Sequence, residues 1–167
     1  MSHEPDRLAL SALVEEALTD AQWAVTGPGE GEVQPWHLAF ALLLRPAVRN
    51  KVGKSAGLPK QKTLRGALFA QDSFPTIAET APRGWLRKLL DRTPLQTAVF
   101  LPWQVRVVTY HPLITECARS VLTQSQGDQG ASLLSCLVST DKETRDALQK
   151  EGIDVEALLR RLQANST

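Results

Sequence analysis

Three residues, Cys117, Cys136 and His111, have the side chains best suited to metal binding or nucleophilic catalysis. Zinc sites draw their cysteines and histidines from closely spaced pairs, and these three residues form no such pair. Both cysteines fall on the apolar faces of expected helices, where the reactive thiolate is disfavoured. We therefore expect no metal ion and no cysteine nucleophile, and we interpret both cysteines as reduced, buried thiols rather than a disulfide.

The chain also lacks the pattern of a nucleotide site. Gly53-Lys54-Ser55 resembles the end of a phosphate-binding loop, but Val48 stands five residues before Gly53, where that loop requires glycine. The acidic residues fall at helix starts and on outward positions, which is typical of solvated helix faces. They include Glu15, Glu16, Asp141, Glu143 and Glu156. We expect no cofactor and no catalytic acid–base pair.

Aromatic and basic residues are the better candidates for function, since tryptophan and arginine are favoured where proteins bind one another. Trp23 and Trp36 flank a glycine-rich turn, with His37 beside Trp36, and Trp85 begins an amphipathic segment that includes Arg87 and Lys88. The alternative is that these tryptophans pack in their own core, and that His37 satisfies a neighbouring turn. The candidate partner-binding residues are Trp23, Trp36, His37, Trp85, Arg87 and Lys88.

The composition is that of a globular protein without a nucleic-acid field. The 167 residues are 43% hydrophobic, and 19 Lys+Arg against 18 Asp+Glu leave a formal charge of +1. No apolar run is long enough to span a bilayer, and residues 1–6 are acidic and polar, unlike a secretory leader. We expect a cytoplasmic monomer that binds neither nucleic acid nor membrane.

Apolar residues at three- and four-residue steps predict four helices in residues 1–69. The first covers residues 6–25 and ends at the turn 26–31. The second covers residues 35–44 and is apolar nearly all round, so we expect it to be the buried centre of its unit. The third covers residues 46–55, with Gly57 as a left-handed cap, and Pro59 opens the fourth.

A partial copy of this pattern follows 95 residues later. Leu38 aligns with Leu133, and Gly57 aligns with Gly152, at the same offset (133 − 38 = 95 and 152 − 57 = 95). Two landmarks in one register indicate an internal duplication. The second unit, residues 111–167, is expected to hold helices at 112–123 and 131–138, followed by two more. A capping box, Thr140 with Glu143, starts the third of these, and Asp154 caps the last.

Residues 70–110 have no counterpart in either unit. They contain the amphipathic helix predicted over residues 84–92, and a stretch around Pro102 whose β-branched and aromatic residues favour one or two short strands. The prediction is therefore an all-α fold of two pseudo-symmetric four-helix repeats, residues 1–69 and 111–167, with an irregular, part-β insert at 70–110. The repeats are expected to pack as one compact domain.

Two tandem units of this kind resemble the double N-terminal domain of the Clp/heat-shock unfoldases. The resemblance rests on Val33-Gln-Pro-Trp-His-Leu-Ala-Phe-Ala-Leu-Leu in the first unit and Glu151-Gly-Ile-Asp-Val-Glu-Ala-Leu-Leu in the second, and it covers about residues 7–69 and 111–164. Family members often carry Glu-His at the start of the apolar helix, and that glutamate helps some of them to bind phosphorylated arginine. Here Trp36-His37 and Ala131-Ser132 occupy those positions, so that ability is not carried over.

The resemblance implies a non-catalytic domain that binds proteins or peptides for an ATP-driven unfoldase, without the ATPase modules. The chain would act as an adaptor, a regulator or a substrate-receiving module of a Clp-type unfoldase or protease. One alternative is an accessory protein that docks on the proteolytic barrel and stabilises it. Another is an enzyme with its site in the insert, although no nucleophile, base and orienting group can be assembled there.

Overall fold

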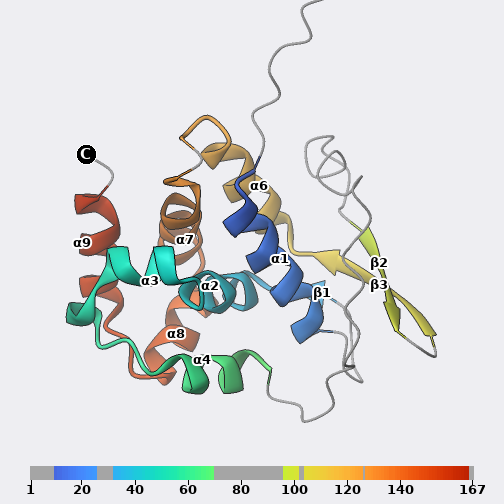
Figure 1. The fold of residues 1–167 in the computed structure, drawn as a ribbon, viewed down its shortest axis with the longest axis horizontal. Helices are drawn as coiled ribbons and strands as arrows, with labels where there is room; N and C mark the ends of the chain where they lie inside the picture. The colour runs from blue at the N-terminus through green and yellow to red at the C-terminus, as the bar shows by residue number, and fades with distance from the viewer. Residues whose placement is uncertain (1–9, 26–31, 70–95, 102–103, 126, 166–167) are drawn as a thin grey trace, which may run out of the picture.

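The computed structural model describes residues 10–25, 32–69, 96–101, 104–125 and 127–165, and most of these residues are helical. Figure 1 shows the helices gathered on one side and a small sheet on the other. The helices are α1 Ala12–Ala24, α2 Pro35–Leu43, α3 Pro46–Val52, α4 Gln61–Leu68, α6 Pro112–Val121, α7 Gln129–Thr140, α8 Lys142–Lys150 and α9 Val155–Ala164, with a short 3₁₀ turn, η1, at Lys54–Ala56. The predominantly helical character predicted from the sequence is confirmed.

Helix α2 lies at the centre of the helical body. Every one of its residues except Trp36 is buried, and it packs against α1, α3, α4, α6, α7 and α8. Pro35 at the first helical position loses no hydrogen bond there, which explains why the helix starts at this residue. The sequence therefore identified the buried helix correctly. None of the helices in the described ranges is both long and apolar enough to cross a membrane.

Most helix ends have the capping residues that the sequence predicted. Gly57 adopts the left-handed conformation, with φ 66° and ψ 33°, and Asp154 caps α9 by accepting from the Ala157 N–H. The predicted capping box at Thr140 is wrong in its residue. Asp141 caps α8 instead, because its carboxylate accepts from the Thr144 N–H at 2.9 Å, whereas Thr140 still belongs to α7.

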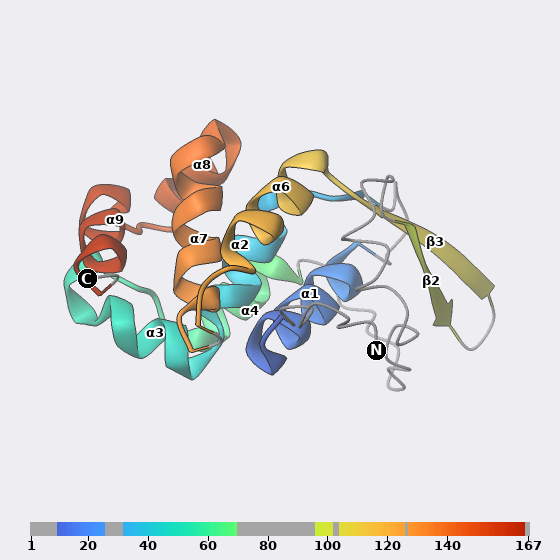
Figure 2. The same cartoon turned by 90° about the horizontal axis from the view of Figure 1, so that it is seen from above.

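Three strands form the sheet beside the helices, in the order β1-β3-β2. Strands β2 (Gln96–Leu101) and β3 (Gln104–Tyr110) make an antiparallel hairpin that extends away from the helical body in Figure 2, which confirms the strands predicted around Pro102. Strand β1 (Glu32–Val33) pairs in parallel with the end of β3 and was not predicted. Two residues are too few to show an alternating pattern. The helix predicted over residues 84–92 lies outside the described residues.

The expectation of two reduced thiols is wrong in this structure. Cys117 of α6 and Cys136 of α7 form a disulfide, with their Cα atoms 5.8 Å apart, which is within the usual range. The two cysteines are 19 residues apart in sequence, but α6 and α7, which carry them, pack side by side. Helix periodicity placed both residues on inward faces, and only the packing of the two faces decided that they meet.

Candidate partner-binding surface

Trp36 is the one residue of α2 that reaches the surface. Its ring centroid lies 3.7 Å from that of His37 and 5.8 Å from that of Phe40, the latter in an edge-to-face arrangement. Phe40 is only 2% exposed and belongs to the core. Trp36 is thus held by two neighbouring rings and presents its remaining surface to solvent, a geometry suited to an apolar contact with another molecule.

His37 positions the start of α2. The residue is 9% exposed, and its Nδ1 accepts a hydrogen bond from the Gln34 N–H at 2.9 Å. The imidazole is therefore neutral, and it satisfies the backbone N–H of the residue that precedes the helix. Burial lowers the pKa of His37 to about 4. Of the two readings that the sequence allowed for this residue, the satisfied turn is the one that the geometry supports.

The stability of the chain should therefore depend on pH through His37. Its folded-state pKa of about 4 lies below the ordinary histidine value of 6.5, so the unfolded chain takes up the proton first as the pH falls. Stability is then fully present above pH 6.5 and is lost progressively between about 6.5 and 4, by about 1–3 kcal/mol in total. Urea denaturation at a series of pH values measures this loss. A His37→Gln variant should show a smaller slope in that window, and an equal slope would contradict the assignment.

The other candidate residues are either buried in the core or lie outside the described residues. Trp23 lies near the end of α1 with 7% of its surface exposed, so it packs with the core, as the alternative prediction had it. Trp85, Arg87 and Lys88 lie outside the described residues. The structure therefore brings Trp36 and His37 together at the start of α2 and leaves Trp36 partly exposed.

Two polar clusters fix the helices on either side of α2. The Arg45 guanidinium, at the start of α3, pairs with Glu16 at 3.0 Å and with Asp20, both on α1. Farther along α3, Lys51 Nζ donates to Gly127 O at 3.0 Å and pairs with Asp128 at 2.7 Å. Each cluster joins segments far apart in the sequence, so both depend on the assembled fold.

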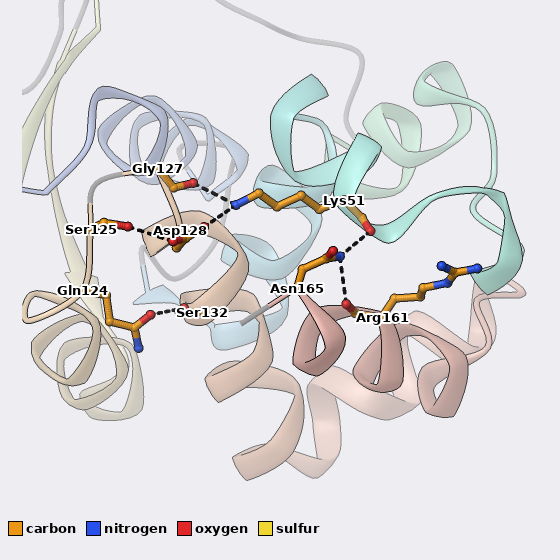
Figure 3. A network of polar contacts seen from close by, with 8 residues as sticks. All are labelled: Lys51, Gln124, Ser125, Gly127, Asp128, Ser132, Arg161 and Asn165. Carbon is orange, nitrogen blue, oxygen red and sulfur yellow. Dashed lines mark hydrogen bonds and ion pairs between the residues drawn. The ribbon is translucent and has the colours of Figure 1, made fainter. Parts of the chain in front are cut away.

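Figure 3 shows the Lys51 cluster, in which α3, α7 and α9 converge. Asn165 donates to Lys51 O at 2.9 Å, and Ser125 donates to the second oxygen of Asp128 at 2.8 Å. The hydrogen bonds from Lys51 and Ser125, together with the charge of Lys51, hold the pKa of Asp128 below its usual range. Because Lys51, Ser125 and Asn165 all donate to partners within the chain, we interpret the cluster as a structural clamp.

Positive charge is concentrated in one segment of the chain, and none of the sequence predictions included it. Between Glu32 and Asp72 the chain has no acidic residue but seven basic ones. They are Arg45, Arg49, Lys51, Lys54, Lys60, Lys62 and Arg65. Counting charge over the whole chain, which gives +1, conceals this asymmetry; counting it by segment would have revealed it.

The described residues contain no group of three or more His, Cys, Asp or Glu side chains arranged to hold a metal ion. Comparisons with known protein families, with curated proteins and with solved structures give no match to this chain. A functional proposal therefore rests on features of this chain itself: a partly exposed tryptophan on the central helix and a basic segment along α3 and α4.

Proposed function

We propose that this chain is a non-catalytic protein-binding module built from two repeats of the Clp N-terminal type. It would act as an adaptor, a regulator or the substrate-receiving module of a Clp-type unfoldase or protease, as a monomer and without binding nucleic acid or membrane. The proposal extends the resemblance carried by Val33–Leu43 and Glu151–Leu159.

The observation that carries the proposal is the correspondence between the two halves of the helical body. In chain order, α2, α3, Gly57 and α4 correspond to α7, α8, Gly152 and α9, and both glycines have positive φ, 66° and 83°. The packing corresponds as well. Helices α1 and α4 contact α2, as α6 and α9 contact α7, while α3 contacts α7, as α8 contacts α2.

The two glycine turns also meet each other. The Asp154 N–H donates to Ala56 O at 2.9 Å, and a Cβ on Gly57 would lie 3.4 Å from Gly152 O. Helices α2 and α7, which correspond to each other in the two halves, also pack against each other. Mutual contact between equivalent elements is the arrangement expected when a duplicated unit packs around a local two-fold axis.

Trp36 supplies the surface for such a function, because a partly exposed tryptophan fixed by neighbouring rings loses little side-chain entropy on binding. In a pull-down from native extract, we expect the intact chain to retain an unfoldase, a protease subunit or their substrates, and Trp36→Ala to lose them. Leu113→Ala is the matched control, since Leu113 is also a partly buried apolar residue but lies on α6.

Three results of this pull-down would be informative. Loss of the same proteins in both variants would point to a general effect on folding rather than to the surface at Trp36. Recovery of the protease ring without an unfoldase would favour an accessory protein that docks on the proteolytic barrel. Recovery of no Clp component by the intact chain would contradict the proposal.

A further inference from the structure

The positive charge of this chain is concentrated on one segment. The segment between Glu32 and Asp72 has seven basic residues and no acidic one, so its charge is +7, whereas the charge of the whole chain is +1. The rest of the chain therefore carries 12 Lys+Arg against 18 Asp+Glu, a charge of −6 (19 − 7 = 12; 12 − 18 = −6). The segment therefore has a field opposite in sign to that of the remaining chain. A separation of charge on this scale favours a partner that meets only the basic segment.

Three of the seven cations are already used by the fold. Arg45 pairs with two carboxylates of α1, Lys51 pairs with Asp128, and Arg49 donates to Pro59 O. The four others form what we call the basic surface, namely Lys54, Lys60, Lys62 and Arg65. All four are exposed, and no ion pair links them to an acidic residue in the described part of the chain.

The basic surface follows η1 and the first turns of α4. In Figure 1 the chain between α3 and α4 runs along the lower left edge of the molecule, and α4 continues along the lower edge. Lys62 and Arg65 are three residues apart on α4 and therefore share one side of that helix. The Arg65 guanidinium carbon lies 5.7 Å from the centroid of the Phe69 ring, a contact that limits its freedom.

The fold does not favour this arrangement of charges. Lys60 is the N-cap of α4 and Lys62 lies in its first turn, where the helix dipole is positive and acidic residues are stabilising. Lys62 and Arg65 also repel each other, as like charges at this spacing do. An unfavourable placement of charges that no contact within the chain compensates is expected at a functional surface.

We propose that the basic surface binds an acidic segment of another polypeptide. The inference rests on the proposed protein-binding function and names the chemistry of the partner. Carboxylates of a short acidic segment would pair with Lys60, Lys62 and the pre-positioned Arg65. A nucleic acid fits less well, because a long polyanion would extend beyond this segment onto a chain whose remaining charge is −6, as counted above.

A binding assay with purified full-length chain tests this inference without any Clp component. The probe is a fluorescently labelled poly-glutamate peptide, followed by anisotropy at low ionic strength. Lys60→Glu, Lys62→Glu is the test variant. Lys142→Glu, Lys150→Glu is the matched control, because it makes the same change of charge at two exposed lysines of α8.

We expect the test variant to bind the peptide at least about 10-fold more weakly, and the control to stay within about 2-fold of the original chain. Added salt should weaken the binding of the original chain. Equal loss in both variants, or no binding by the original chain, would overturn the inference. So would tighter binding of a single-stranded oligonucleotide, or of anionic vesicles, that depends on the same two lysines. The peptide assay and the pull-down with Trp36→Ala are independent, so a failure of one does not imply a failure of the other.

Discussion

Replacing Leu42 by alanine is expected to lower the free energy of unfolding by about 2–5 kcal/mol, because it removes a large side chain from a site that cannot collapse fully. Leu42 is completely buried on α2, the helix that packs against six others. A loss of this size is a large fraction of the stability of a typical domain. We therefore expect the variant to be partly unfolded under conditions in which the original chain is folded.

Urea denaturation followed by circular dichroism measures this effect. Leu159→Ala is the matched control. It removes the same side-chain atoms, but from a partly buried position on α9. We expect it to cost about 1 kcal/mol, because less apolar surface leaves contact with the core. Equal losses in the two variants would show that α2 does not have the central position assigned to it.

Breaking the disulfide between Cys117 and Cys136 is expected to destabilise the chain by about 2–4 kcal/mol. The crosslink closes a loop with a sequence separation of 19 residues, which spans the turn that carries Gly127 and Asp128. Opening it increases the freedom of the unfolded chain and loosens the connection between α6 and α7. Thermal unfolding with and without a dithiol reductant should therefore give a lower midpoint in the reduced sample.

A double variant, Cys117→Ala with Cys136→Ala, separates this effect from other actions of the reductant. Its unfolding midpoint should match that of the reduced original chain and should not respond to added reductant. Mass spectrometry after alkylation under denaturing conditions gives the thiol content directly. Two alkylated cysteines in the chain purified without reductant would contradict the disulfide.

Local signals account for the parts of the fold that the sequence predicted well. The apolar run of α2 demanded burial on all sides, and Gly57 marked a turn that needs a positive φ. Asp154 was identified as a cap because a carboxylate can accept from the N–H groups of the next turn. Each of these inferences depends on residues within a few positions of one another, where spacing along the chain and geometry in space agree.

Contacts across long sequence separations account for the rest of the candidate site. Trp23 and Trp36 are the same residue type and both lie in predicted helices, yet the former packs in the core and the latter is partly exposed. The orientation of α1 and α2 against the other helices decides this difference. The basic surface combines a local and a tertiary feature. Its charges lie close together in the sequence, and only the structure shows that they are exposed.

The sequence by itself determined the helical character of this protein, the burial of α2 and the strands around Pro102, because periodicity and turn chemistry are local properties. Tertiary structure alone decided the Cys117–Cys136 disulfide, the pairing of β1 with β3 and the Lys51 clamp. These features join segments separated by 19 to 114 residues, and which surfaces meet over such distances is set by the packing of whole helices.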